Sequence, residues 1–149
     1  MALKPLPQDF KEFLKLLNSH HVEYLVIGGY AVSYHGYPRP TGDLDVWIAL
    51  DMANAERVRS AVAEFGFHGA GLSAELFLKP RCVVRMGVQP VRIEILNSIS
   101  GAVFAECFAR RVSAELDGVI VNVISLDDLK RNKKASGRLK DLADLEYLP

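Results

Sequence analysis

Residues 24–48 read YLVIGGYAVSYHGYPRPTGDLDVWI, and this stretch contains the most informative pattern in the chain. It begins with the apolar run Tyr24–Ile27, which is typical of a buried strand and is ended by two glycines. A brief helix is predicted over Ala31–His35, before a loop that contains two prolines. A second strand is predicted over Leu44–Leu50, so the stretch combines a strand, a glycine turn, a short helix and another strand.

The rest of the chain supplies helices and strands in an order that indicates an α/β (α+β) fold. Helices are predicted over residues 9–20, from Asp51 to Gly66, and over residues 101–110, 125–136 and 140–147, with Asp9 as the first N-cap. Strands are predicted over residues 81–87, 91–96, 111–116 and 119–124. We expect a mixed sheet with helices mainly on one face, in a single domain over residues 1–149 with a C-terminal helical motif at about residues 125–148.

The composition is that of an ordinary globular protein. The chain has 149 residues, of which 50% are hydrophobic, and its formal net charge is zero, so any polyanion site would be a local patch. Cys82 and Cys107 lack the spacing of a disulfide framework or a zinc site and are predicted to be free thiols. The sequence contains no apolar segment typical of a signal peptide or a membrane span, so we expect a cytoplasmic protein without a membrane partner.

Two acids stand at strand spacing in Asp43-Leu44-Asp45. Residues two positions apart in a strand point to the same face, so both carboxylates leave from one face while the apolar residues between and after them are buried. Neighbouring carboxylates raise each other's pKa unless a cation lies between them, and Mg²⁺ prefers such oxygen ligands. Two solvated acids on an exposed strand face would give the same pattern.

A third acid, Glu94, is expected to join this pair. In the strand over residues 91–96 the β-branched residues share one face, which places Glu94 on the opposite face. If this strand lies beside the strand of the two aspartates, three carboxylates converge and can hold two metal ions for an in-line phosphoryl displacement. The alternative for Glu94 is a surface ion pair with Arg92 or Arg85.

Gly28 and Gly29 come directly after the first buried strand and before the short helix. At such a place backbone N–H groups can turn toward an anion without interference from a Cβ atom. Paired glycines are frequent in turns of every kind. The order of strand, glycine pair, helix, loop and acid pair is therefore more informative than any one of its parts.

This order resembles the signature of the nucleotidyltransferase superfamily, which has the DNA polymerase β-like fold. Thirteen residues, 30–42, separate the glycine pair from Asp43-Leu44-Asp45. The tail NKKASGRLKDLADL, residues 132–145, is similar to the closing motif of abortive-infection nucleotidyltransferase toxins and their small bacterial relatives. Together these motifs span nearly the whole chain.

The resemblance implies roles for several residues. The glycine pair would face a nucleoside triphosphate, the two aspartates would bind metal, and Glu94 would be the third carboxylate. Lys134, Arg138 and Asp141 would belong to the active centre, with Asp141 either a base for the acceptor hydroxyl or only the ion-pair partner of Arg138. The chain departs from the family pattern where Gly29 replaces a frequent serine and where Glu94 replaces a frequent aspartate.

Further candidates surround the predicted nucleotide site. Six basic residues lie between positions 130 and 140, and Lys134 and Arg138, four positions apart, are the pair we select for contact with the triphosphate. The others are more simply explained as a solvated helix face. Arg39 and Thr41, in the loop before the acid pair, could contact phosphate or base, and Tyr30 could stack on a nucleobase or pack on a neighbouring side chain.

These features predict a metal-dependent nucleotidyltransferase that moves an NMP from an NTP to an acceptor hydroxyl and releases pyrophosphate, with Mg²⁺ or Mn²⁺ as cofactor. The tail indicates a toxin that modifies RNA such as tRNA, and a protein acceptor is also open. An antitoxin partner or a homodimer could supply the surface that specifies the acceptor. The alternative is a non-catalytic module of the same fold that binds an NTP and metal, or a partner.

Overall fold

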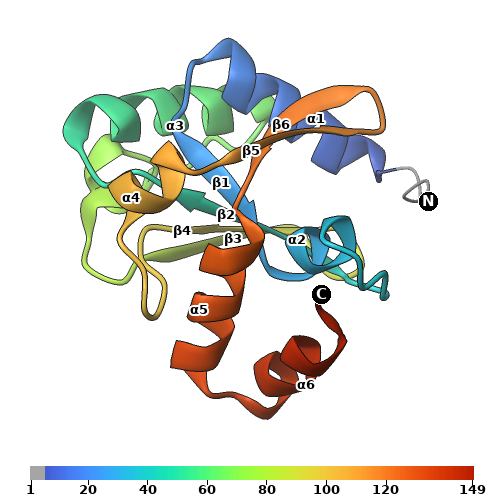
Figure 1. Ribbon diagram of the computed structural model, residues 1–149. Coiled ribbons are helices and arrows are strands. Elements are labelled where there is room, and N and C mark those ends of the chain that lie inside the picture. The colour runs from blue at the N-terminus through green and yellow to red at the C-terminus, as the bar shows by residue number, and fades with distance from the viewer. Residues whose placement is uncertain (1–5) are drawn as a thin grey trace.

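Every strand that the sequence predicts is present in the computed structural model, which describes residues 6–149 (Figure 1). The strands are β1 (Tyr24–Ile27), β2 (Asp43–Ile48), β3 (Val83–Met86), β4 (Arg92–Leu96), β5 (Val112–Leu116) and β6 (Val119–Val123). The helices are α1 (Gln8–Ser19), α2 (Gly28–Tyr34), α3 (Met52–Phe65), the 3₁₀ helix η1 (Ala74–Leu78), α4 (Phe104–Ala109), α5 (Leu126–Ser136) and α6 (Leu139–Tyr147). The fold is therefore of the mixed α/β class.

The strands form one mixed sheet in the order β3-β4-β2-β1-β6-β5. Three neighbouring pairs, β1 with β2, β3 with β4 and β5 with β6, are antiparallel, whereas β2 with β4 and β1 with β6 are parallel. The predicted hairpin turn between β5 and β6 has positive φ at both Asp117 and Gly118, as a type I′ turn requires. The parallel pairing of β2 with β4 matters most for function, because it joins the two strands that carry the predicted acids.

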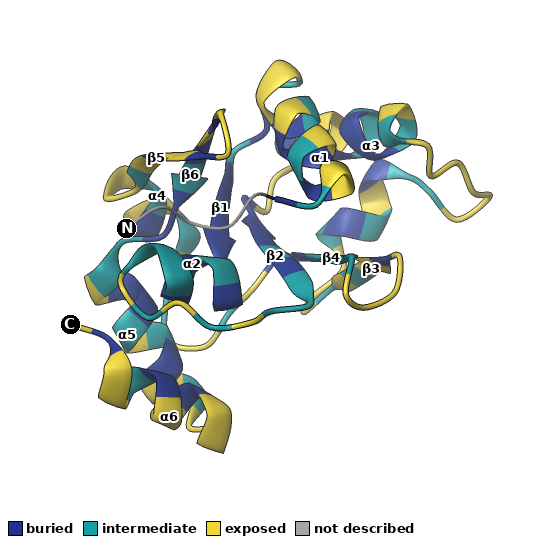
Figure 2. Cartoon of the chain, turned by 90° about the vertical axis from the view of Figure 1, so that its right-hand side faces the viewer, coloured by how far each residue is buried: buried dark blue, intermediate teal, exposed yellow. Residues whose placement is uncertain are grey.

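The two faces of the sheet are covered unequally. Helices α1 and α3 lie together on one side of it (Figures 1 and 2), and Phe13 of α1 meets Phe65 of α3 edge to face at a ring-centroid distance of 5.2 Å. On the other side, Trp47 of β2 packs edge-on against Phe104 of α4 at 5.1 Å, so this tryptophan contributes to packing. The part of that face next to Trp47, where the predicted acids stand, is left as the wall of a cavity.

Three local details differ from the sequence-based expectation. Asp9 lies inside the first turn of α1, where an acid also favours the helix dipole, and the N-cap is Pro7. Helix α2 begins at Gly28 itself, so the glycine pair forms its first turn and does not precede the helix. Helix α4 begins only at Phe104, because the backbone of the preceding Val103 is extended, with φ −113° and ψ 127°.

Helices α5 and α6 follow the sheet as a C-terminal pair (Figure 1). The predicted cap of α5 is confirmed, since the side chain of Ser125 accepts a hydrogen bond from the backbone N–H of Asp128. No helix within residues 6–149 combines the length and the apolar character that crossing a membrane requires. Residues 1–5, on which the expectation of no signal peptide partly rests, lie outside the described part of the chain.

Candidate functional site

Strands β2 and β4 bring the three predicted acids together. In their parallel pairing Asp45 lies directly beside Glu94, and Asp43 lies beside Arg92. One carboxylate oxygen from each of the three acids lies within 4.8 Å of the other two. The condition on which the expectation for Glu94 rested, that its strand lies next to the strand of the aspartates, is confirmed.

Asp45 is the acid whose ionisation is most disfavoured. Burial, followed by the charges of Glu94 and Asp43, raises the pKa of Asp45 from 3.8 to about 7. The positive charge of Lys140 acts in the opposite direction but does not compensate. A cation placed among the three carboxylates would remove this penalty, which is the arrangement expected of a metal site.

Asp43 is in the opposite electrostatic state because it already has a cationic partner. Nε and Nη2 of Arg92 donate to its two oxygens at 3.0 and 3.1 Å, and the amide of Gln89 donates to both oxygens at 3.3 Å. Burial acts to raise the pKa of Asp43, but the hydrogen bonds from Arg92 and Gln89 together outweigh it and lower that pKa.

Glu94 has both of the ion pairs that were the alternative to a role in metal binding. Nη2 of Arg92 lies 3.1 Å from its Oε1, and Nε of Arg85 lies 3.2 Å from the same atom. The two explanations for Glu94 are therefore not exclusive. One oxygen of Glu94 lies within 4.8 Å of an oxygen of each aspartate, which is close enough to share a cation with them. In the structure, two arginines neutralise the charge of Glu94.

The glycine pair is fixed against these acids by close contact. Gly28 has φ +67°, and a Cβ atom there would collide with the carboxylate of Asp45. A Cβ atom on Gly29 would collide with Oγ1 of Thr41, the hydroxyl that donates to the backbone carbonyl of Asp43 at 3.2 Å. The frequent serine of the superfamily therefore does not fit at position 29, because a threonine hydroxyl from the neighbouring loop takes the space.

Two other predicted nucleotide contacts are already engaged within the protein. Arg39 lines the cavity, but its Nε and Nη2 donate to the two oxygens of Asp144 at 2.9 Å each. Tyr30 packs edge to face on Phe10 at 5.7 Å and is not among the described residues that line the cavity. The packing alternative is thus the one that the structure displays for Tyr30.

The C-terminal helices place Lys133, and not the predicted Lys134, toward the cavity. Lys134 is exposed and absent from the cavity lining of the described chain, whereas Lys133 is 4% exposed. Nζ of Lys133 lies 2.9 Å from both Asp141 and Asp144. The sequence did contain a signal for this assignment, because Lys133 follows the buried Leu129 by four positions and so shares its helix face.

Asp141 is held as an ionised partner of three donors. It accepts hydrogen bonds from Lys133, from Nε of Arg138 at 2.8 Å and from the hydroxyl of Ser136. Burial acts to raise the pKa of Asp141, but these donors together lower it to about 2. A carboxylate so weakly basic and so fully engaged suits the ion-pair partner of Arg138 better than a base for an acceptor hydroxyl.

These residues surround a single cavity of about 670 Å³. Its lining includes the glycine pair, the three acids and the arginines beside them, the loop 98–100, and side chains of α5 and α6 that include Arg138 and Lys140. The cavity is thus acidic at the sheet and basic along the C-terminal helices.

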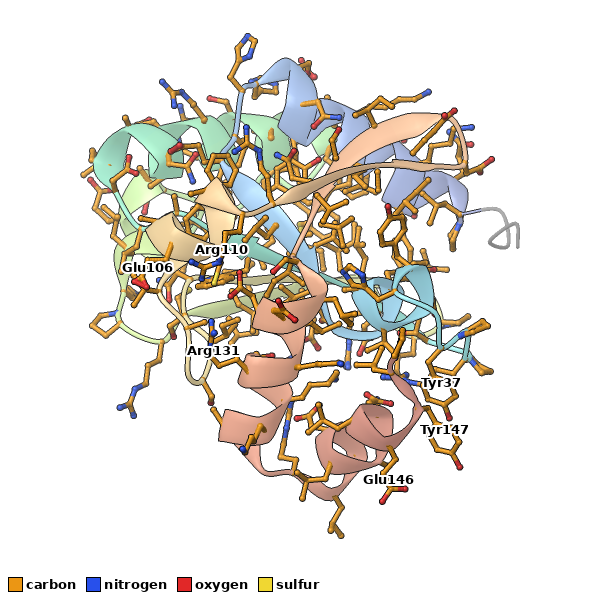
Figure 3. The ribbon with its side chains drawn as sticks, in the orientation of Figure 1. Tyr37, Glu106, Arg110, Arg131, Glu146 and Tyr147 are labelled. Carbon is orange, nitrogen blue, oxygen red and sulfur yellow. The ribbon has the colours of Figure 1, made fainter. Side chains whose placement is uncertain are left out.

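A separate charged cluster lies outside this lining, where Arg110 and Arg131 both donate to the buried Asp128. Figure 3 labels the two arginines beside α4 and α5.

Comparisons with known proteins give the family and the fold of the chain. Residues 7–148 match the model of a family described as "Nucleotidyl transferase of unknown function (DUF2204)". The fold is similar to the crystal structure of a "putative nucleotidyltransferase" from Thermotoga maritima, with a TM-score of 0.64, 16% identity, and coverage of 92% of this chain and 88% of that one. A search of curated proteins found no match. At this identity the structural similarity shows the fold, and the family match covers nearly the whole chain.

Proposed function

The chain belongs to the nucleotidyl transferase family whose model it matches, and from this membership we propose that it is a metal-dependent nucleotidyltransferase. An acceptor hydroxyl oxygen attacks the α-phosphorus of an NTP, the bond from that phosphorus to the leaving pyrophosphate breaks, and the hydroxyl proton is released. The observation that carries the proposal is the convergence of Asp43, Asp45 and Glu94 within 4.8 Å.

The donor set fits a hard divalent cation. Three carboxylates offer oxygen ligands, and the missing Cβ of Gly28 lets the carboxylate of Asp45 lie directly against the backbone of the glycine pair. Bound Mg²⁺ or Mn²⁺ would neutralise charge on the attacking and leaving oxygens during an in-line displacement. Asp45 has the most to gain from such a cation, because burial and then the charges of Glu94 and Asp43 raise its pKa to about 7.

The side chains opposite the acids suit the rest of a triphosphate. Lys140 is exposed and lines the cavity. Its positive charge acts to lower the pKa of Asp43 and, against the larger opposite effects there, that of Asp45. Arg138 lines the same wall and is 78% exposed, so it is free to turn toward an anion while Asp141 anchors it. These cations would stabilise charge that develops on the leaving pyrophosphate.

The acceptor is proposed in a second step. RNA, with tRNA as the first to be tested, is suggested by the similarity of residues 132–145 to the toxin motif, and a protein hydroxyl is the other acceptor class. An antitoxin or a second copy of the chain would then be the partner. The non-catalytic alternative is favoured by one observation, namely that both oxygens of Asp43 are already bound by Arg92.

The test is transfer of label from each α-³²P-labelled NTP, with Mg²⁺ or Mn²⁺, to bulk tRNA, to other RNA and to proteins of a cell extract. We expect transfer by the native protein and a loss of at least about 100-fold in Asp43→Asn and Asp45→Asn. Glu115→Gln, which removes an exposed acid on β5, is the matched control and should act like the native protein. Metal-dependent NTP binding without transfer to any acceptor would favour the non-catalytic module.

A further inference from the structure

Arg92 occupies an unusual position for a residue next to a metal site. It is the first residue of β4 and the direct neighbour of Asp43 across the parallel pairing. Its single guanidinium group donates to both oxygens of Asp43, at 3.0 and 3.1 Å, and lies 3.1 Å from Glu94. Two of the three carboxylates that would hold a metal are therefore bound by one arginine.

A metal ion and this guanidinium group compete for the same oxygens. Mg²⁺ binds carboxylate oxygen at about 2.0–2.1 Å, which would place a double positive charge within about 4 Å of the guanidinium group. Each carboxylate oxygen has a second lone pair, so the two cations are not excluded from Asp43 by a shortage of acceptors. The repulsion between them weakens metal binding to Asp43 as long as Arg92 stays on that carboxylate, and movement of Arg92 away from it relieves this repulsion.

The released side chain has a nearby anion to bind once a nucleotide is present. Arg92 lines the same cavity as the glycine pair, and 30% of its side chain is exposed. A guanidinium group binds paired phosphate oxygens in the same forked geometry that it uses here on a carboxylate. The metal would bring such oxygens to the place that Arg92 now faces.

We propose that Arg92 works in two positions, which rests on the proposed function. Without metal, it neutralises Asp43 and Glu94 and keeps the empty acid cluster stable. With metal and nucleotide, it leaves Asp43 and binds oxygens of the triphosphate. Arg92 therefore weakens binding of metal alone and strengthens binding of the metal–nucleotide complex. As a result, the site binds metal and nucleotide together more tightly than it binds either of them alone.

Arg85 provides a matched comparison on the adjacent strand. It lines the same cavity and lies 3.2 Å from Glu94, but it is 58% exposed and has no hydrogen bond to Asp43 among the described contacts. If local positive charge alone governs metal binding, replacing Arg85 or Arg92 has similar effects. If the fork on Asp43 governs it, Arg92 has the larger effect and Arg85 the smaller one.

The experiment measures Mn²⁺ binding by electron paramagnetic resonance without nucleotide, and binding of a non-hydrolysable α,β-methylene NTP at saturating Mn²⁺ by calorimetry. For Arg92→Gln we expect Mn²⁺ alone to bind about tenfold more tightly and the nucleotide analogue about tenfold more weakly. For Arg85→Gln, both changes should be smaller, within about threefold. Arg92→Lys, which keeps the charge without the fork, should lose nucleotide affinity and bind Mn²⁺ alone more tightly than the native protein, but by less than Arg92→Gln does.

Each opposite outcome has a definite meaning. Unchanged or weaker Mn²⁺ binding by Arg92→Gln, or unchanged affinity for the nucleotide analogue, overturns the two-position role and leaves a purely structural ion pair. A thermal melt in EDTA checks folding; if Arg92→Gln does not fold, Arg92→Lys decides the question through its nucleotide affinity. If the native protein binds neither Mn²⁺ nor the analogue, the proposed function fails together with this inference, whereas native binding that Asp45→Asn abolishes keeps the function and isolates the role of Arg92.

Discussion

The sheet and the C-terminal helix pair are stabilised in opposite ways. In the sheet, β2 buries Leu44 and Val46 completely and turns its carboxylates outward. Helix α6 does the reverse, because Asp141 and Asp144 are 5% and 2% exposed while Leu139 is 86% exposed. In Figure 2 the ribbon of α6 carries both buried and exposed segments, and much of it is coloured as exposed. Burial of apolar side chains thus stabilises the sheet, which carries the acids of the cavity. Buried ion pairs help to hold the C-terminal helices, which carry its cations.

This attachment centres on Asp144 of α6. Asp144 binds Arg39 through both oxygens, and Arg39 belongs to the loop that leads into β2. A second cation, Lys133, holds the same aspartate from α5. These charge pairs, together with the stacking of Tyr147 on Tyr37 at a ring-centroid distance of 4.6 Å, therefore hold α6 against the rest of the chain.

The largest expected effect is a charge placed in the apolar region. Leu44→Asp puts a carboxylate into a fully buried position between the two site aspartates. A cost above about 5 kcal/mol is expected, comparable to the whole stability of a domain of this size. Circular dichroism and soluble yield would show loss of the folded state. A cooperatively folded Leu44→Asp protein would contradict the view that apolar burial holds β2.

The second largest effect is expected from breaking the ion pairs of the C-terminal helices. Lys133→Met keeps the apolar stem but leaves Asp141 and Asp144 without their shared cation, at a cost of about 3 kcal/mol. Urea unfolding measures the change. Lys134→Met, which alters an exposed neighbour, is the control and should change stability by less than about 0.5 kcal/mol. Equal effects of the two variants would contradict a stabilising role for the buried ion pairs of Lys133.

The acids on the sheet could be predicted from sequence, whereas among the ion pairs of the helices only the local one between Arg138 and Asp141 could be anticipated, as one of two alternatives. The alternation of apolar and polar residues in β2 and β4 sets which face each acid occupies, and this signal is local. The bond between Arg39 and Asp144 joins residues 105 positions apart, so no local pattern reports it. The fork of Arg92 on Asp43 likewise depends on β2 lying next to β4. These two residues stand 49 positions apart in the sequence, so no local pattern predicts their contact.

Acid should separate the two regions, because the pKa of Asp141 in α6 is lowered whereas that of Asp45 in β2 is raised. The folded-state pKa of Asp141 is about 2, below its ordinary value of 3.8, so its contribution is complete above about pH 4 and is lost as the pH falls through 2. The loss amounts to about 2 kcal/mol. Hydrogen exchange followed by mass spectrometry should show α6 losing protection between pH 4 and 2 before β1 does. Simultaneous loss in both would contradict an independent attachment.

The acid cluster should respond over a different pH range. Asp45 has a folded-state pKa of about 7, above its ordinary value, so the protonated form is favoured and stability without metal falls as the pH rises from about 4 to 7. Below pH 7 a cation must displace this proton. The apparent affinity for Mn²⁺ should therefore rise up to about tenfold per pH unit below 7 and level off above it. A flat profile from pH 5.5 to 7 would show that Asp45 is not a ligand.

The smallest effect is expected when a leucine is again replaced by aspartate, as in Leu44→Asp, but in α6 instead of β2. Leu139→Asp places a carboxylate at the start of α6 on a side chain that is 86% exposed, so little apolar burial is lost. An acid in a first helical turn also interacts favourably with the helix dipole. Urea unfolding should change by less than about 0.5 kcal/mol in either direction. A cost near that of Lys133→Met would instead mean that Leu139 is covered in solution, and sedimentation equilibrium would then show whether a second copy of the chain covers it.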